Sequence, residues 1–280
     1  MRVYLTSDLH LLGNEPGGDE AVVRLASFAE HDATENDVLI LNGDLGSNDL
    51  AIMNCLAIFS GFPGKKLAVL GNHDLWSLDE LATTRYQFLQ TRVLPSFGFH
   101  SLDLAPCVYE GIAFVGSIGW YDYSLARIKG VSRDVFSAKI LPEDRSVSWG
   151  DAFYVDWGGL SDEDVTELQL TKLRQHLEMV QSAEKIVVAM HHLATRKLLV
   201  GPDYLVPRKW GFLNAFLGST RFSELFAEFA GKISRVFCGH VHNQKNVLDQ
   251  GVKYTSLGGD YRTKEILVYN PADDTGRVGT

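Results

Sequence analysis

The side chains best able to do chemistry in this sequence follow five short hydrophobic segments. They are Asp8 and His10, Asp44, Asn72 with His73 and Asp74, His191 with His192, and His240 with His242. Carboxylate, amide and imidazole ligands without a thiolate suit manganese, iron or zinc. The set offers more ligands than one ion needs. Two ions that share a carboxylate, roughly 3.5–4 Å apart, would use them.

The spacing within two of these groups supports a convergent site. Asp8 and His10 are two residues apart, as are His240 and His242. Side chains two apart on an extended chain point to the same side, so each pair can direct two ligands at one place.

Glycines stand directly before three of the candidate groups. They are Gly43, Gly71 and Gly239. Glycine permits a sharp turn and a close approach of the backbone. We therefore expect the chain to turn tightly at these positions.

The elements that must position these residues alternate along the chain. We expect strands over residues 3–6, 38–41, 67–70, 112–115, 186–190, 235–238, 252–257 and 265–269. We expect helices over residues 19–30, 49–59, 78–93, 161–181 and 222–229, with Ser161 as an N-cap. Such alternation predicts an α/β fold, in which ligands bind beyond the carboxyl ends of the strands. We expect one domain over residues 1–280, with irregular insertions near 116–160 and 193–220 over the active-site face.

The composition limits the classes of function that the protein can have. The 280 residues carry a net charge of -9, which argues against sequence-independent nucleic-acid binding. No apolar run reaches the roughly 18 residues of a membrane span, and the N-terminus lacks the features of a signal peptide. The three cysteines are far apart, so neither a disulfide framework nor a thiolate zinc site is expected. We expect a cytoplasmic protein, and the sequence does not indicate its oligomeric state.

In order along the chain, the five groups form the blocks D-x-H, G-D, G-N-H-D, H and G-H-x-H, from Asp8 to His242. This series resembles the calcineurin-like metallophosphoesterase superfamily. The resemblance implies an α/β fold of four layers, an αββα sandwich with two mostly mixed β-sheets flanked by helices.

The same resemblance implies roles for individual residues. The first metal ion would be held by Asp8, His10, Asp44 and His242. The second would be held by Asp44, Asn72, His191 and His240, with Asp44 bridging the two. A metal-bridging hydroxide would attack a phosphodiester or phosphomonoester. His73 would face the substrate and either stabilise the transition state or protonate the leaving oxygen. The expected substrate is a small or nucleotide-like phosphate ester.

Several assignments have alternatives. The resemblance places the ligand first after its strand, so His191 is taken as the ligand, and His192 then lines the pocket or packs on the sheet. Asp74 orients a histidine or caps the next helix. Trp120 and Tyr121 in the first insertion could contact substrate, although such aromatic residues more often pack an insertion.

Competing functions also follow from the resemblance. Phosphoprotein phosphatases of the superfamily carry G-D-x-x-D-R-G, whereas residues 43–49 here read G-D-L-G-S-N-D. A DNA or RNA nuclease of the superfamily would need a basic groove. A non-catalytic scaffold of the same fold would have lost ligands, and here none is missing.

Overall fold

Two six-stranded sheets form the centre of the molecule, which is described here from a computed structural model over residues 1–201 and 206–279. The first sheet contains, in spatial order, β12 (Thr275–Gly279), β11 (Ile266–Asn270), β1 (Val3–Thr6), β2 (Val38–Asn42), β3 (Lys65–Val69) and β4 (His100–Ser101). The second contains β5 (Cys107–Tyr109), β6 (Ile112–Ser117), β7 (Lys185–Met190), β8 (Ile233–Cys238), β10 (Val252–Ser256) and β9 (Lys245–Asp249).

Both sheets are mixed. Strands β1 to β4 are parallel, and β11 and β12 continue the first sheet in antiparallel pairing. In the second sheet β6, β7, β8 and β10 are parallel, and β5 and β9 pair antiparallel at its two edges. The parallel strands place their carboxyl ends together, which is the geometry that concentrates functional side chains.

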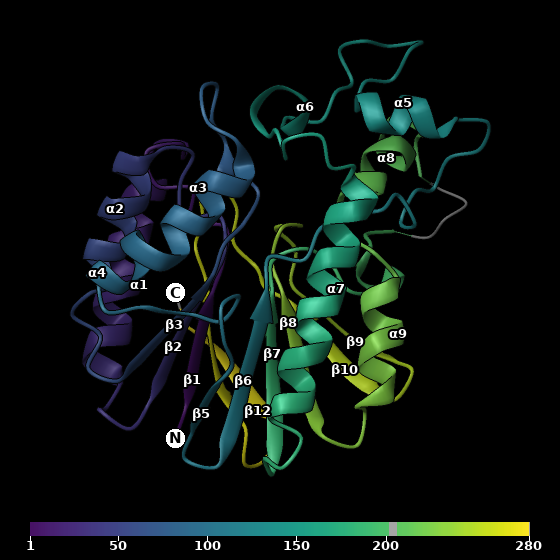
Figure 1. Cartoon of the computed structure of the whole chain (residues 1–280). Coiled ribbons are helices and arrows are strands. Elements are labelled where there is room, and N and C mark those ends of the chain that lie inside the picture. Colours follow the sequence, from purple (N-terminus) through teal and green to yellow (C-terminus); the bar gives the residue numbers. More distant parts are fainter. Residues whose placement is uncertain (202–205, 280) are drawn as a thin grey trace.

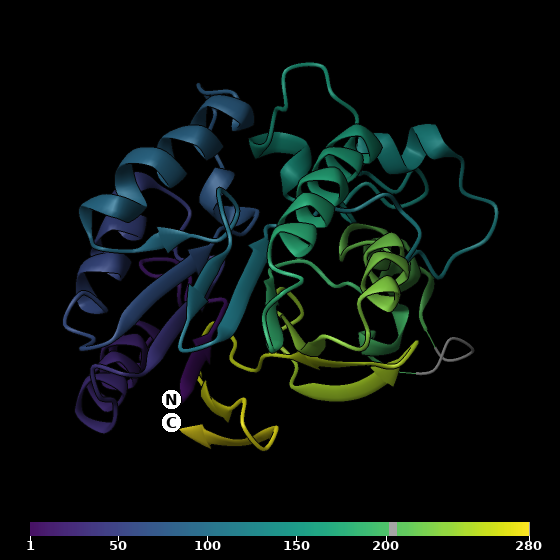
Figure 2. The same ribbon diagram turned by 60° about the horizontal axis from the view of Figure 1, so that its bottom comes forward.

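Helices cover the outer faces of the two sheets (Figure 1). Beside the first sheet lie α1 (Gly18–Asp32), α2 (Asp49–Ile58), α3 (Ala82–Phe88), the π-helical turn η2 (Leu89–Val93) and α4 (Leu94–Ser96). Beside the second lie α7 (Asp162–Met179) and α9 (Arg221–Glu228), as the turned view also shows (Figure 2). The expected sandwich of two mixed sheets between helical layers is confirmed.

The alternation of side chains along the strands explains this layering. Val3 and Leu5 of β1 and Val187 of β7 belong to one buried cluster between the sheets. Tyr4 of β1 packs instead with the helices of the first layer, and Val188 of β7 with those of the second. Because successive side chains point to opposite faces, strands buried on both sides read as continuous hydrophobic runs.

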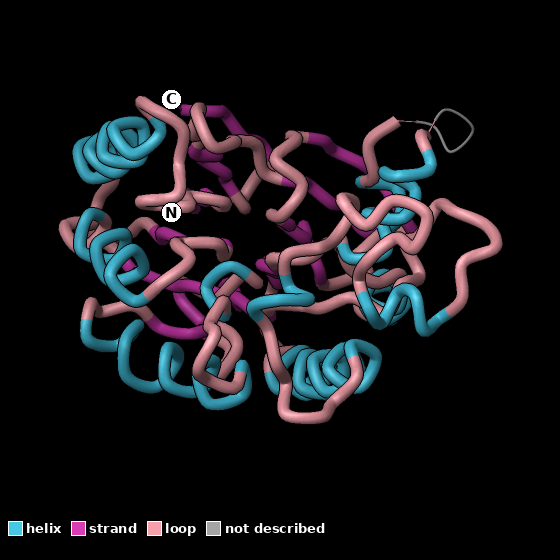
Figure 3. The backbone as a smooth tube through the Cα atoms, turned by 90° about the horizontal axis from the view of Figure 1, so that it is seen from above, coloured by secondary structure: helices cyan, strands magenta, loops and turns pink. Residues whose placement is uncertain are grey.

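The loops and short helices gather at one end of the sheets (Figure 3). They include η1 (His73–Leu75), α5 (Arg133–Ala138), α6 (Asp151–Tyr154), η3 (Arg196–Leu198), α8 (Arg208–Leu213) and η5 (Asn214–Phe216). The two stretches expected to be irregular therefore hold several short helices. These helices were not expected, because they span too few residues to show a helical period.

The expected major elements lie close to their observed bounds. The capping prediction at Ser161 is confirmed, since its hydroxyl accepts the backbone N–H of Asp164 in a capping box. The helix expected from residue 78 begins at Ala82 instead, and its end is a π-helical turn before Pro95, which has no N–H to donate. No helix in the described part of the chain is long and apolar enough to cross a membrane.

Candidate metal centre

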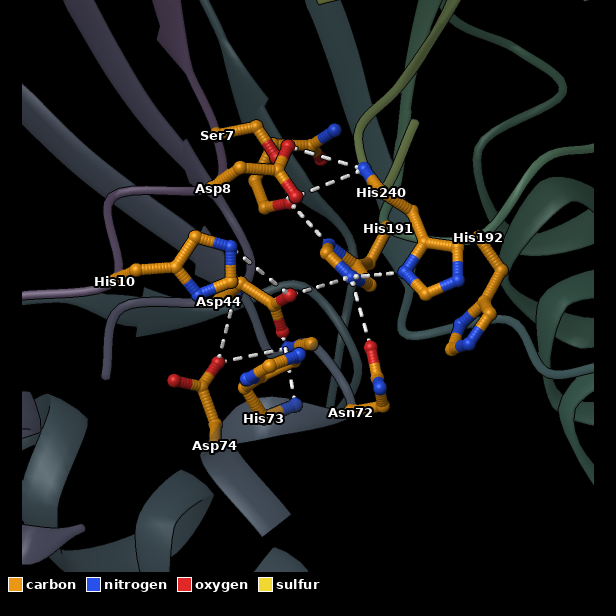
Figure 4. A network of polar contacts seen from close by, with 12 residues as sticks. Ser7, Asp8, His10, Asp44, Asn72, His73, Asp74, His191, His192 and His240 are labelled. Atoms are coloured by element: carbon orange, nitrogen blue, oxygen red, sulfur yellow. Dashed lines mark hydrogen bonds and ion pairs between the residues drawn. The ribbon is translucent and has the colours of Figure 1, made fainter. Parts of the chain in front are cut away.

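The carboxyl ends of five parallel strands converge on one cluster of side chains (Figure 4). Asp8 and His10 follow β1, Asp44 follows β2, Asn72 follows β3, His191 follows β7, and His240 and His242 follow β8. Residues far apart in sequence thus meet at the boundary of the two sheets. Three groups of His and Asp side chains place their ligand atoms within 4.8 Å of one another, and one of these groups combines His10 and Asp44 with His73.

The first group is Asp8, His10 and His242. The Nε2 atoms of His10 and His242 lie 3.2 Å apart, and His242 Nε2 lies 3.3 Å from Asp8 Oδ1. Asp8 also accepts the backbone N–H of His240 at 3.0 Å. This backbone contact ties the end of β8 to the end of β1.

The second group is Asp44, His191 and His240. The Nε2 atom of His191 lies 3.4 Å from Asp44 Oδ2, 3.1 Å from His240 Nδ1 and 3.3 Å from Asn72 Oδ1. On the other side of His191, Nδ1 lies 3.0 Å from the carbonyl oxygen of Asn42, which directs Nε2 into the cluster.

The chemistry of these contacts fits metal ions. Two imidazole nitrogens that face each other at about 3 Å, as His10 and His242 do, are held either by a hydrogen bond from one neutral ring to the other or by a cation that both rings bind. The same holds for His191 and His240. The donor set of carboxylates, imidazoles and one amide oxygen is one that first-row divalent ions accept.

Burial and neighbouring charges shift the pKa values of these groups. Burial lowers the pKa of His10 to about 3 and lowers that of His240 well below its ordinary value, so both rings are neutral, which is the form in which histidine binds metal ions. Burial also lowers the pKa of His191, but the Asp44 carboxylate outweighs it and raises that pKa to about 9. Burial raises the pKa of Asp44, but its histidine neighbours bring it well below the ordinary value.

Five of the cluster residues have left-handed backbone. The φ angles are +57° at Asp8, +44° at His10, +56° at Asp44, +72° at His240 and +49° at His242. Non-glycine residues adopt this region rarely, and each instance costs about 1–3 kcal/mol that the surrounding structure must offset. Such strain gathered in one place is typical of a functional site.

Glycine is required beside these turns. Gly43 has φ +89°, and a Cβ there would lie 2.5 Å from His191 Nδ1. A Cβ on Gly71 would lie 2.1 Å from Asp44 Oδ1. The close approach expected at these glycines is therefore present, and a side chain would displace the cluster.

Comparison with known proteins agrees with this geometry. The model of the calcineurin-like phosphoesterase family matches residues 1–244. The chain belongs to this family. It is therefore a metal-dependent phosphoric ester hydrolase, and the three side-chain groups supply candidate ligands for the dinuclear divalent metal centre that the family uses.

Two solved structures share the fold. The phosphopantetheinyl hydrolase of Mycobacterium tuberculosis superposes with a TM-score of 0.70 at 20% identity, over 91% of this chain and 89% of that chain. A dimetal phosphatase from Danio rerio superposes with a TM-score of 0.60 at 13% identity, over 96% of this chain and 92% of that chain. A search of curated proteins found no match.

In this calcineurin-like phosphoesterase, Asp74 has a role that neither alternative foresaw. Its buried carboxylate accepts four backbone N–H groups, those of Asp44, Leu45, Gly46 and Gly71, at 2.8–3.1 Å. Asp74 therefore fixes the turn that carries Asp44 against the turn that carries Asn72.

His73 lies between the ligand cluster and open space. Its backbone N–H donates to Asp44 Oδ1 at 2.9 Å, and its ring stacks on Trp76 with centroids 3.7 Å apart. The edge of the His10 ring approaches it at 4.7 Å between centroids. The ring is half-buried and lines a cavity, as the expected substrate-facing position requires.

Three further residues that we expected to contact substrate lie beneath the cluster. Trp120, Tyr121 and His192 are fully buried. Trp120 Nε1 donates to Asp162 at 2.8 Å, and the His192 ring packs against Trp120 at 5.0 Å. Their buried positions favour the interpretation that they pack the insertion. Their contact with substrate stays a prediction.

Asp151 is a site residue that sequence reasoning missed. Its buried carboxylate accepts four side-chain donors: Asn72 Nδ2 at 2.9 Å, Trp76 Nε1 at 2.8 Å, Tyr121 Oη at 3.0 Å and Trp149 Nε1 at 2.8 Å. Because the Asn72 amide donates to Asp151, its oxygen is directed toward His191. Asp151 also positions the indole on which His73 stacks.

Replacement of Asp151 by asparagine is expected to weaken metal binding about 10–100-fold, the usual cost of losing a group that orients a ligand. The NH2 group of asparagine would face two of the four donors and could not accept their hydrogen bonds. The Asn72 amide or the indoles would therefore rotate. The measurement is the dissociation constant for Mn²⁺ by titration calorimetry, together with kcat.

Asp162→Asn is the matched control. Asp162 is also buried and accepts the indole of Trp120, the hydroxyl of Tyr123 and the ammonium of Lys139, but it holds none of the cluster residues. It should lower stability and leave Mn²⁺ affinity unchanged. Equal loss of affinity in both variants would mean that Asp151 acts only through general stability.

Proposed function

We propose that this protein hydrolyses a small phosphate ester, a phosphomonoester or a phosphodiester, at a pair of divalent metal ions. The observation that carries the proposal is the position of one carboxylate. Asp44 Oδ2 lies 3.7 Å from His10 Nε2 and 3.4 Å from His191 Nε2, so it faces both groups of ligands at once. A shared carboxylate is the arrangement that a dinuclear centre needs.

The residues fit two sites on either side of that carboxylate. Asp8, His10, Asp44 and His242 would hold one ion. Asp44, Asn72, His191 and His240 would hold the other. When bound, two divalent ions lower the pKa of water and neutralise charge on phosphate oxygens.

The chain's own residues complete the chemistry. His73 is the candidate general acid, because its ring stands at the rim of the ligand cluster and faces the cavity. Protonation of the departing oxygen by a positioned histidine contributes roughly 10²–10⁴-fold in rate. Asp44 holds the backbone of His73, so the position of the acid is fixed relative to the ligands.

The metal and the substrate class that we propose rest on the types of ligand, the net charge and the similar solved structures. Manganese, iron and zinc all suit the ligand set. The net charge of -9 disfavours nucleic acid as the substrate. The Mycobacterium tuberculosis neighbour is named as a phosphopantetheinyl hydrolase and not as a nuclease. We also propose a cytoplasmic location and one domain over residues 1–280.

Removal of metal is expected to abolish hydrolysis. Treatment with a chelator followed by dialysis should lower the rate on generic phosphomonoesters and phosphodiesters by about 10³-fold or more, since metal ions supply several kcal/mol of transition-state stabilisation. Addition of Mn²⁺, Fe²⁺ or Zn²⁺ should restore it. The measurement is phosphate or alcohol release alongside metal content by mass spectrometry.

The substrate panel should include cyclic nucleotides, nucleotides and single- and double-stranded DNA. Faster, salt-sensitive cleavage of DNA would replace the small-ester proposal with a nuclease. Hydrolysis that persists in protein shown to hold no metal would overturn the proposed mechanism.

A further inference from the structure

A cavity of about 740 Å³ opens directly beside the ligand cluster. Asp44, His73, His240 and His242 line one side of it. Its volume lies within the roughly 300–1,000 Å³ range of small-molecule sites. A phosphate placed against the ligand cluster would therefore extend its organic group into this cavity.

The wall opposite the ligands is mostly apolar. It is formed by Trp149, Val206, Pro207, Trp210, Leu213 and Leu217, among others. Trp210 lies on α8 and is 55% exposed, whereas tryptophan side chains are on average highly buried in folded proteins. Trp149 is half-buried, and its ring meets the edge of His240 at 5.4 Å, so the apolar wall begins next to the ligands.

Positive charge is scarce among the residues that line the cavity, although the Lys209 ammonium lies 5.5 Å from the centroid of the Trp210 ring. Apart from histidine, Arg127 is the basic residue among the described residues that line the cavity. Its guanidinium donates to the carbonyl oxygens of Val200 at 2.6 Å and Gly201 at 2.8 Å. Recognition of further phosphates uses clusters of arginine or lysine directed at the ligand. The described wall holds no such cluster.

We propose that this cavity selects phosphate esters whose organic group is uncharged and largely apolar, such as an aryl or branched alkyl group. The inference rests on the proposed function, because it assigns the phosphate to the ligand cluster. The organic group then lies between Trp149 and Trp210. Burial of apolar surface supplies the binding energy, at about 25 cal/mol per Å².

The test compares two esters in the metal-reconstituted protein. Trp210→Ala should lower kcat/KM for 1-naphthyl phosphate about tenfold, a typical loss for removing apolar contact in a pocket. The same variant should change kcat/KM for phosphoserine less than about twofold. Because each ester is compared with itself in the two proteins, the different reactivities of the leaving groups cancel.

Phe153→Ala is the matched control. Phe153 is also 55% exposed and lies in α6, but it does not line this cavity. It should leave both esters unchanged. Calorimetry with 1-naphthylmethylphosphonate, which cannot be hydrolysed, gives a second measurement. Its affinity should fall about tenfold in Trp210→Ala and stay constant in Phe153→Ala.

Equal losses of kcat/KM for both esters, or equal losses in both variants, would overturn the proposed selection for apolar groups. The proposed function would still hold if the wild-type protein hydrolyses these esters. Failure to hydrolyse any ester with any metal would overturn the proposed function instead. In that case the phosphonate affinities alone would decide whether the cavity binds apolar groups.

Discussion

Replacement of Asp44 by asparagine is expected to remove both metal ions and to lower turnover about 10³-fold or more. Its carboxylate faces His10 at 3.7 Å and His191 at 3.4 Å, so one substitution affects both groups of ligands. A neutral amide cannot bridge two cations as a carboxylate does. Loss of the several kcal/mol that metal ions contribute corresponds to a rate loss of this size. Metal content by mass spectrometry and kcat on a phosphomonoester give the measurement.

The substitution keeps the size of the side chain, so its effect separates charge from packing. Asp37→Asn is the control, because Asp37 is also buried and ion-paired, with Arg2 at 2.9 Å, but lies at the opposite end of β2. We expect it to lower thermal stability and to keep both ions. An Asp44→Asn protein that retained two ions and a tenth of the wild-type rate would show that Asp44 does not bridge.

The position of these ligands was predictable because it follows from a local rule. Hydrophobic runs that are buried on both faces indicate parallel strands, and parallel strands bring their carboxyl ends to one edge. Asp8, Asp44 and His191 each stand one or two residues beyond such a strand. The residues that follow β1 and β2 therefore had to lie near one another once the strands were assigned. β7 belongs to the other sheet, so the place of His191 beside them followed only from the family resemblance.

Other features depend on contacts that no local pattern records. Asp151 is 79 residues from Asn72 and begins a helix of four residues within an aromatic-rich stretch. Its role emerges only when four donors from separate segments meet it. Asp74 is similar, since the turn it fixes lies 28–30 residues earlier in the chain.

The short edge strands were also not predicted from the sequence. In β12, four of the five residues are exposed, so no alternation of buried and exposed positions marks the strand. β4 has only two residues, and pairing with β3 alone defines it. Edge strands of this kind gain their structure from a neighbour and not from their own hydrophobicity.

Substitution of His73 by alanine is expected to keep both metal ions and to lower kcat on an unactivated alkyl phosphate by roughly 10²–10⁴-fold, the usual contribution of a general acid. The ring faces the cavity, whereas its backbone N–H, which alanine retains, is the group that contacts Asp44. The metal ligands should therefore stay in place. The measurement is kcat on the alkyl ester with metal content determined on the same sample.

A second substrate distinguishes proton donation from positioning. A nitrophenyl ester leaves readily without a proton, so His73→Ala should lose far less activity on it than on the alkyl ester. His100→Ala serves as control, because that ring contacts the Ala105 carbonyl oxygen at 2.8 Å away from the cluster and should affect neither ester. Equal losses on both esters would show that His73 holds the substrate in place. A near wild-type rate on the alkyl ester would remove it from the chemistry.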